Sequence, residues 1–247
     1  MINTIGFIVF ILLPLSELLL KQFITPKLKP LKLSVLFMLL ILSDQTNLFA
    51  QDPLRFEAEI DHLDSIDYDF DQSKSIILFT GSSSIRKWDS LSVYFPEHQI
   101  INNGFGGSQM SDLLYYADVL IIKHAPDKVF IYEGDNDIAD DKNIDEIMVI
   151  TKKLVKRLKK EISGVEIIFI SAKPSLARWE LKNEYLELNS AIKDYCSSKS
   201  YLTYANVWDI MLDTYGSPKA DLFVKDGLHL NEKGYDLWAK ELGKYLN

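Results

Sequence analysis

The sequence predicts an α/β fold, a three-layer α/β/α sandwich built around a five-stranded parallel sheet. Two observations carry this prediction: five short apolar runs alternate with segments of helical periodicity, and polar or glycine-rich turns follow the runs. Strands that alternate with helices imply right-handed crossovers, which make the sheet parallel and cover both of its faces. Because ligands of such sheets bind beyond the carboxyl ends of the strands, residues capable of chemistry should gather in the turns that follow them.

The five candidate strands are short and rich in β-branched residues. Apolar runs of this length, bounded by turn residues, are typical of parallel strands that are buried on both faces. They span residues 75–80, 98–102, 128–133, 165–171 and 201–207.

Four segments between and after these strands show helical spacing. The clearest spans 143–163, where apolar residues recur on one face and Gly164 supplies a C-terminal stop. The other three are predicted at 109–124, 180–199 and 231–246. A shorter amphipathic helix is expected between Leu54 and Ile66, followed by an acidic connector before the first strand.

The composition divides the chain into an N-terminal apolar leader, residues 1–50, and a folded domain, residues 51–247. A basic stretch, a second apolar run at 33–42 and the small residue Ala50 follow one another in the order of a secretory signal peptide, which predicts cleavage after Ala50. The first apolar run, 5–20, is near the lower length limit for a bilayer span, so a retained membrane anchor and a later start site are the alternatives. We therefore expect an exported protein, periplasmic or extracellular, that is either released or membrane-anchored.

The charge of the chain disfavours nucleic acid as a partner. The formal net charge is −8, and the leader is itself basic, so the folded domain is the more acidic part. An acidic domain without a Lys/Arg-rich stripe gains no affinity from counterion release. The single cysteine, Cys196, excludes an intrachain disulfide and leaves no second thiol for a metal or redox pair, so we expect it to be a small buried apolar residue.

The first turn after a strand reads FTGSSSIRKW at 79–88. Gly81 permits a sharp turn, which would present a hydroxyl at the edge of the sheet above the start of a helix. The alternative is that the three serines only cap that helix, because serine is a preferred N-cap residue.

The next two turns offer hydrogen-bond donors. The turn NNGFGGSQM at 102–110 fits neither the P-loop nor the dinucleotide fingerprint, but it exposes bare backbone N–H groups. The turn YEGDNDIAD at 132–140 places Asn136 just past a strand. Its amide is a neutral donor suited to a negative charge that appears only during a reaction, and an ordinary Asx turn is the alternative.

The acidic residues of the third turn do not form a calcium motif. Ala139 occupies a ligand position of the EF-hand pattern and no glycine follows it, so no metal site is predicted. A solvated acidic loop is expected instead. It comprises Asp135, Asp137, Asp140 and Asp141.

The last turn, FVKDGLHLNEKGY at 223–235, places Asp226 and His229 three residues apart in a loop that leads into the terminal helix. This spacing lets one carboxylate and one imidazole converge. The remaining histidines, His62, His98 and His124, lack a comparable setting and are predicted to be structural or solvent-facing.

Together the four turns resemble blocks I, II, III and V of the SGNH hydrolases, the GDSL-like lipase/acylhydrolase superfamily. The motifs GSSSIRKW, NNGFGGS, GDND and DGLHLNEKGY are similar to those of its platelet-activating-factor acetylhydrolase-like and lysophospholipase-like branch. Each motif alone is weak, but they occur in the family's order over roughly residues 75–245. The resemblance implies a flavodoxin-like sandwich and a serine esterase that acts through an acyl-enzyme without metal or organic cofactor.

The resemblance also assigns roles residue by residue. Ser83, two places after Gly81, matches the nucleophile, and Trp88 supports this register. Asp226 and His229 match the Asp-x-x-His pair that completes the catalytic triad. The oxyanion hole would comprise the backbone N–H groups of Ser83 and Gly107 and the side-chain amide of Asn136.

Two residues depart from the family pattern. Ser82 stands where many members carry the aspartate of Gly-Asp-Ser, and Leu230 replaces the proline common after the histidine. Neither position belongs to the triad, so we expect the chemistry to survive.

Several alternatives concern substrate and class. The expected substrate is a small-molecule or polysaccharide ester with a small acyl group, such as O-acetyl on carbohydrate, and the alternative is a lysophospholipid or thioester with a longer acyl chain. Lys173, Arg178 and Trp179, after the fourth strand, are expected to line either site. The α/β-hydrolase architecture is excluded because no G-x-S-x-G elbow occurs. A noncatalytic carbohydrate-binding module on the same fold would predict a missing triad member, and none is missing.

Overall fold

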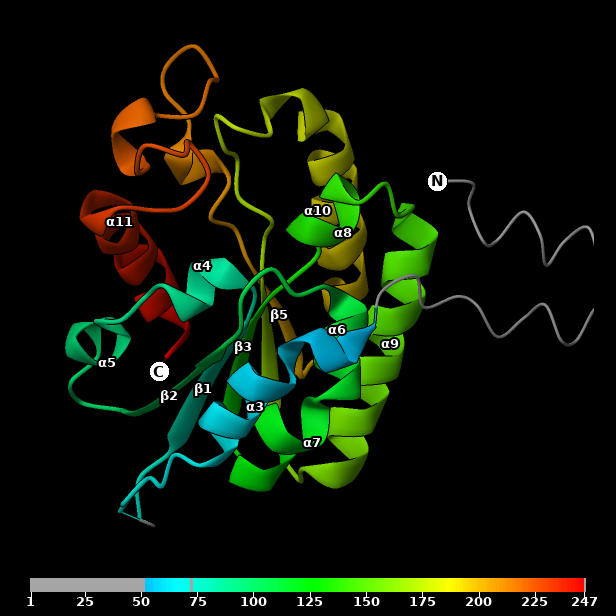
Figure 1. Cartoon of the computed structure of the whole chain (residues 1–247), viewed down its shortest axis with the longest axis vertical. Helices are drawn as coiled ribbons and strands as arrows, with labels where there is room; N and C mark the ends of the chain where they lie inside the picture. Colours follow the sequence, from blue (N-terminus) through cyan, green and yellow to red (C-terminus); the bar gives the residue numbers. More distant parts are fainter. Residues whose placement is uncertain (1–51, 72, 247) are drawn as a thin grey trace, which may run out of the picture. The chain divides into compact units, whose positions relative to one another are not determined.

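The computed structural model describes residues 52–71 and 73–246, and it contains the predicted five-stranded parallel sheet (Figure 1). The strand order is β2-β1-β3-β4-β5, and every neighbouring pair is parallel. The strands are β1 (Ile76–Gly81), β2 (Gln99–Gly104), β3 (Lys128–Tyr132), β4 (Glu166–Ile170) and β5 (Leu202–Ala205). All five predicted strands and the α/β fold class are therefore confirmed.

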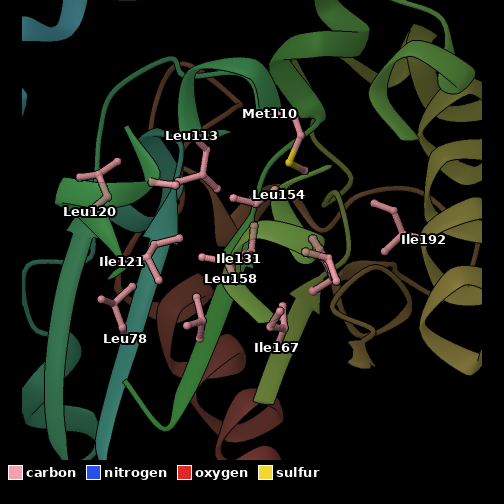
Figure 2. Close-up of a cluster of buried hydrophobic side chains, with 14 of the residues drawn as sticks. Leu78, Met110, Leu113, Leu120, Ile121, Ile131, Leu154, Leu158, Ile167 and Ile192 are labelled. Atoms are coloured by element: carbon pink, nitrogen blue, oxygen red, sulfur yellow. The ribbon is translucent and has the colours of Figure 1, made fainter. Parts of the chain in front are cut away.

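The strands are apolar throughout because both faces of the sheet are buried. Alternate residues point to opposite faces, so Leu78 packs into one core while Ile77 and Phe79 pack into the other. Figure 2 shows part of the first core, where Leu78, Ile131 and Ile167 of the sheet meet side chains of the covering helices. Continuous apolar runs rather than alternating ones are the expected signature of such strands.

Helices cover both faces and complete the three layers (Figure 1). The first core is covered by α3 (Glu57–Asp64), α6 (Met110–Tyr115), α7 (Ala117–Leu120), α9 (Ile144–Glu161) and α10 (Lys182–Ser197), and the second by α4 (Ser83–Arg86), α5 (Leu91–Tyr94) and α11 (Glu232–Leu242). The short helix α8 (Asp135–Ala139) follows β3. Short 3-10 turns lie at Pro53–Phe56, Ile122–His124, Trp179–Leu181, Asp209–Met211, Ala220–Leu222 and Gly243–Tyr245.

The long helix α9 begins and ends where the sequence indicates. The side chain of Asn143 accepts a hydrogen bond from the N–H of Glu146 at 2.9 Å, and the Glu146 carboxylate accepts one from the N–H of Asn143 at 3.3 Å. This reciprocal pair is a capping box that satisfies two donors of the first turn. Gly164, with φ +79°, lies just beyond the helix end.

The prediction of one continuous helix at 109–124 is wrong. The segment is divided into α6, α7 and a 3-10 turn, because Tyr116 (ψ 13°) and Ile121 (φ −128°) leave the helical region. The periodic apolar residues still reach one core, since Met110, Leu113 and Leu120 are all fully buried.

The strand order reverses its direction at β1 and β3, which is a topological switch point of the sheet. The chain moves from β1 outward to β2 and then crosses back to β3 on the other side of β1. Loops that follow two such neighbouring strands diverge to opposite faces, and ligands of open α/β sheets bind at this point. The turns after β1 and β3 carry Ser83 and Asn136.

The leader predicted at residues 1–50 lies outside the described residues, as does the boundary with the folded domain. Within residues 52–71 and 73–246, no helix combines the length and the apolarity that a bilayer crossing requires.

Candidate active site

Ser83 is presented by a turn that only glycine can make. At the end of β1, Gly81 has φ +125°, and a Cβ built there would lie 2.0 Å from the carbonyl oxygen of Tyr132. The N–H of Ser82 donates to the same carbonyl at 3.0 Å, which ties the turn to β3. Ser83 then begins α4 with its side chain half-buried.

Asp226 and His229 lie in a short loop that is closed by backbone hydrogen bonds. Phe223 and Leu230 form an antiparallel bridge, and inside it the N–H of Val224 donates to the carbonyl of His229 at 2.9 Å. Within the loop, Oδ1 of Asp226 accepts from the N–H groups of Leu228 at 2.8 Å and of His229 at 2.9 Å. These backbone hydrogen bonds therefore hold the Asp226 carboxylate in place independently of its contact with the imidazole.

The structure brings the three predicted triad residues into one hydrogen-bonded chain. Oγ of Ser83 lies 2.9 Å from Nε2 of His229, and Nδ1 of His229 lies 2.6 Å from Oδ2 of Asp226. A carboxylate can only accept, so Nδ1 carries the hydrogen in this pair and Nε2 is free to accept the proton of the Ser83 hydroxyl. This arrangement can deprotonate the hydroxyl as it attacks an electrophile.

The Asp226 carboxylate is held in its charged form. Partial desolvation raises its pKa, but hydrogen bonds from the His229 ring and from the N–H groups of His229 and Leu228 outweigh this and hold the pKa well below its usual range. The carboxylate consequently remains ionised at neutral pH, where it accepts the Nδ1 hydrogen of His229.

The predicted oxyanion donors Gly107 and Asn136 are joined through Ser108. Gly107 is exposed with φ +73°, and the space that a Cβ would occupy is open. Nδ2 of Asn136 donates to the carbonyl oxygen of Ser108 at 2.8 Å. The structure thus ties the side chain of Asn136 to the residue that follows Gly107.

The three predicted substrate-lining residues differ in exposure. Lys173 is only 1% exposed, and burial lowers the pKa of its ammonium group to about 8. Arg178 and Trp179 are half-buried; both terminal nitrogens of Arg178 donate to Oδ1 of Asn136 at 3.1 Å, and the Trp179 ring stacks on Trp208 at 5.9 Å. Their contact with substrate stays a prediction.

The solvated acidic loop predicted after β3 is wrong for two of its four residues. Asp135 and Asp137 are buried, at 5% and 1% exposure, whereas Asp140 and Asp141 are exposed. Each buried carboxylate has partners that repay its desolvation: the Tyr132 hydroxyl donates to Asp135 at 3.0 Å, and the N–H of Met110 donates to Asp137 at 3.0 Å. Cys196 is buried as expected, and burial raises the pKa of its thiol to about 12.

The glycine-rich turn is stabilised by a tertiary contact that the sequence does not indicate. Both carboxylate oxygens of Glu59, in α3, accept from the N–H of Gly106 at 3.2 Å. The guanidinium of Arg86 pairs with Glu59 at 3.4 Å and lies so close to Gly106 that a Cβ there would be 2.4 Å from it. No local pattern distinguishes Glu59 from the other acids of this helix, so only the tertiary contact reveals it.

In the part of the chain that is described, no cluster of three or more His, Cys, Asp or Glu residues could hold a metal ion.

Comparisons with known proteins point to one family. The family model described as GDSL-like Lipase/Acylhydrolase matches residues 64–237. Among curated proteins, the N-acylneuraminate cytidylyltransferase of Escherichia coli O18:K1:H7 is 25% identical over 181 residues, which are 71% of this chain and 41% of that protein. The chain spans about two-fifths of the length of this relative.

Solved structures share the fold at low sequence identity. A Streptococcus pneumonia protein provisionally described as a platelet activating factor superposes with a TM-score of 0.69 at 24% identity, covering 84% of this chain and 99% of that one. An acetyl xylan esterase from Geobacillus stearothermophilus superposes with a TM-score of 0.58 at 16% identity, covering 69% and 93%.

Proposed function

Because the chain belongs to the GDSL-like lipase/acylhydrolase family, we propose that it is a carboxylic ester hydrolase with Ser83 as nucleophile, His229 as general base and Asp226 as the residue that orients the imidazole. One observation carries the proposal: the contacts of 2.9 Å and 2.6 Å join the three side chains in the order hydroxyl, imidazole, carboxylate. Nucleophile, base and orienting carboxylate in hydrogen-bond contact are the geometric signature of this chemistry.

The proposed reaction proceeds through an acyl-enzyme. Oγ of Ser83 attacks the ester carbonyl as Nε2 of His229 takes its proton, and Asp226 stabilises the imidazolium that forms. The tetrahedral intermediate collapses, the alcohol leaves with the proton from His229, and the acyl group remains on Ser83. Water, activated by His229 in the same way, then releases the acid and restores the hydroxyl.

The oxyanion of the tetrahedral intermediate would be held by the N–H groups of Ser83 and Gly107 and by the amide of Asn136. Arg178 can only donate, so the Asn136 atom that faces its two nitrogens must be the carbonyl oxygen. This contact fixes the orientation of the amide. Of the two hydrogens on Nδ2, one is donated to the carbonyl of Ser108, which leaves the other for the substrate oxyanion.

The proposed substrate is an ester of a small acyl group, such as O-acetyl on a carbohydrate, either as a small molecule or within a polysaccharide. Polar groups of the proposed oxyanion hole support this assignment, namely the exposed backbone of Gly107 and the amide of Asn136, to which the guanidinium of Arg178 donates. The shared fold with an acetyl xylan esterase is consistent with it.

A second candidate is hydrolysis of esters or thioesters with longer acyl chains, as in a lysophospholipase. Leu176 and Val224 favour it because they are 44% and 43% exposed beside the catalytic loop. The N–H of Leu176 donates to the carbonyl of Gly227, and the N–H of Val224 to that of His229. An acyl chain could therefore lie on apolar surface next to the imidazole.

Acyl-chain preference separates the two candidates. The full-length chain, purified in detergent, is expected to hydrolyse p-nitrophenyl acetate with a kcat/KM about tenfold or more above that for p-nitrophenyl octanoate, because a small polar site has no room for the longer acyl chain. A site that buries the chain would instead gain about 0.8 kcal/mol for each methylene and favour the octanoyl ester. Ser83→Ala provides the background rate for both esters. A preference for the octanoyl ester would instead establish the second candidate.

Three further assignments accompany this proposal. Export to the periplasm or the exterior, with a cleaved leader or a retained membrane anchor, rests on residues 1–50 and their composition. The division at residue 51 rests on the same shift in composition. The absence of a nucleic-acid partner rests on the net charge of −8.

A further inference from the structure

Glu133 is a buried acid beside the proposed oxyanion hole. It directly follows β3 and is 2% exposed. Three other buried carboxylates lie near it, and each has a cationic partner. The pairs are Arg55 with Asp112 at 2.5 Å, Lys142 with Asp137 at 3.2 Å and Arg178 with Asp135 at 3.7 Å. Among the described residues Glu133 has no such partner, which sets it apart from its neighbours.

The hydrogen bonds of Glu133 indicate which form of the acid is present. Oγ of Ser108 lies 2.5 Å from Oε1 of Glu133 and 3.2 Å from the carbonyl oxygen of Phe105. The Ser108 hydroxyl has one hydrogen, so it can donate a full hydrogen bond to only one of these two oxygens. When it donates to Phe105, the short contact with Glu133 is a hydrogen bond in which Glu133 is the donor. Oε2 of Glu133 is buried and has no hydrogen-bond partner within residues 52–71 and 73–246, which is costly for a carboxylate and much less so for the carbonyl oxygen of a neutral acid.

We propose that the neutral carboxyl group of Glu133 donates a hydrogen bond to Ser108 and thereby positions the oxyanion-binding turn at residues 105–108. Glu133 acts through Ser108 and touches no reacting atom, so it is a positioning residue. The inference rests on the proposed function, because it assigns a purpose to the same site.

Ser108 connects every part of this turn. Its hydroxyl closes the turn onto Phe105, its carbonyl accepts from Nδ2 of Asn136, and Gly107 lies between the two bonded residues. The N–H of Phe105 donates to the carbonyl of Gly81 at 2.8 Å, which ties the other end of the turn to β1. The bond from Glu133 therefore anchors Ser108 to the end of β3. Ser108 contacts the side-chain donor Asn136 and directly follows the backbone donor Gly107 of the proposed oxyanion hole.

The surroundings of Glu133 favour its neutral form. Burial raises the pKa of Glu133 well above its usual range, and the charges of Asp137, Asp135 and Asp112 raise it further. A hydrogen bond donated by Ser108 would lower this pKa, but in the proposed arrangement Ser108 accepts from Glu133 and the neutral form is favoured. These three acids come from α6 and α8, and Arg55, Lys142 and Arg178 are the cations that face them.

A pair of variants tests the donor role. Glu133→Gln keeps the size and a neutral donor, so kcat for p-nitrophenyl acetate should stay within about threefold of wild type. Glu133→Met keeps the length but cannot donate, so kcat should fall about tenfold or more while KM changes less than threefold. Equal losses in the two variants would overturn the proposal, and so would an unchanged kcat in Glu133→Met.

A second route covers the case in which Glu133→Met does not fold. Ser108→Ala removes the acceptor and should itself lower kcat about tenfold, for the same reason. A kcat of Ser108→Ala within threefold of wild type would overturn the proposal, because the turn would then be positioned without this contact.

Thermal unfolding tests the protonation state of Glu133 without an activity assay. In the unfolded chain Glu133 ionises above about pH 4.3, whereas in the folded protein it keeps its proton. The wild-type protein therefore loses stability as the pH rises above about 4.3, while Glu133→Gln has no proton to lose at this position and does not. The Tm of Glu133→Gln minus that of wild type should therefore increase between pH 5 and 8 by roughly 3–5 °C per pH unit. The exposed Glu187→Gln is the matched control and should show no such trend.

The two measurements separate the inference from the proposed function. A flat Tm difference for Glu133→Gln overturns the neutral acid even if esterase activity is present. A rising difference in a chain whose ester hydrolysis is unaffected by Ser83→Ala would leave the protonated Glu133 intact and overturn the proposed function.

Discussion

Asp226 acts through the geometry of a single hydrogen bond. Its Oδ1 is occupied by two backbone N–H groups, so Oδ2 alone faces Nδ1 of His229 at 2.6 Å. The side chain is 44% exposed, so the attraction between the two charges is screened by water. We infer that its main contribution is the orientation and tautomer of the imidazole rather than the stability of the fold.

Asp226→Asn should therefore lower kcat by roughly 10⁴-fold with little change in KM. An asparagine that keeps its oxygen on the two backbone N–H groups turns its NH₂ toward Nδ1, which forces the hydrogen onto Nε2 and removes the acceptor for the Ser83 proton. Steady-state hydrolysis of p-nitrophenyl acetate measures the effect.

The matched control is Asp221→Asn. Asp221 is 64% exposed and pairs with Lys233 at 3.3 Å on the segment leading to the same loop, and its loss should leave kcat unchanged. More than a tenth of the wild-type kcat in Asp226→Asn would show that the imidazole is oriented by another group.

At the scale of elements, the turn between β1 and α4 is the feature that places Ser83, the proposed nucleophile. The backbone of Gly81 approaches β3 so closely that no side chain fits, and Ser83 begins the helix two residues later. The loop before α11 brings His229 to meet it across 146 residues of sequence. The site thus depends on one close contact between neighbouring strands and on one loop closed by its own backbone bonds.

Gly81→Ala should lower the free energy of unfolding by about 3 kcal/mol or more, because a new Cβ would collide with the Tyr132 carbonyl in addition to the strain of a positive φ. Gly164→Ala is the control: φ is +79° there as well, but the space around it is open, so a loss of about 1–2 kcal/mol is expected. Urea unfolding followed by tryptophan fluorescence compares the two. Similar losses would mean that the β1 turn relaxes to admit a side chain.

At the scale of the whole molecule, the sheet could be predicted because its signal is local. Leu78 and Phe79 are buried on opposite faces, so the strand that contains them is apolar throughout and stands out from its surroundings. The convergence of Ser83, Asp226 and His229, the proposed triad, could be predicted because they lie in short motifs whose order matches a known family.

The remaining features depend on contacts between distant segments. Asp137 lies in an acidic turn that the sequence predicts to be solvated. It is buried because its carboxylate accepts from the N–H of Met110 and pairs with Lys142. Glu59 and Glu133 likewise gain their roles from Gly106 and Ser108, which other strands and helices bring to them. A sequence pattern reports the periodicity of one element, and it carries no direct information on such partners.

The most direct test of the central claim is covalent labelling of the full-length chain with a fluorophosphonate, followed by mass spectrometry of the digested protein. A phosphonate reports a serine activated by a neighbouring base, independently of the natural ester. One adduct on Ser83 that is lost in His229→Ala is the predicted result. An adduct on Ser84 instead, or labelling of Ser83 that persists in His229→Ala, would contradict it.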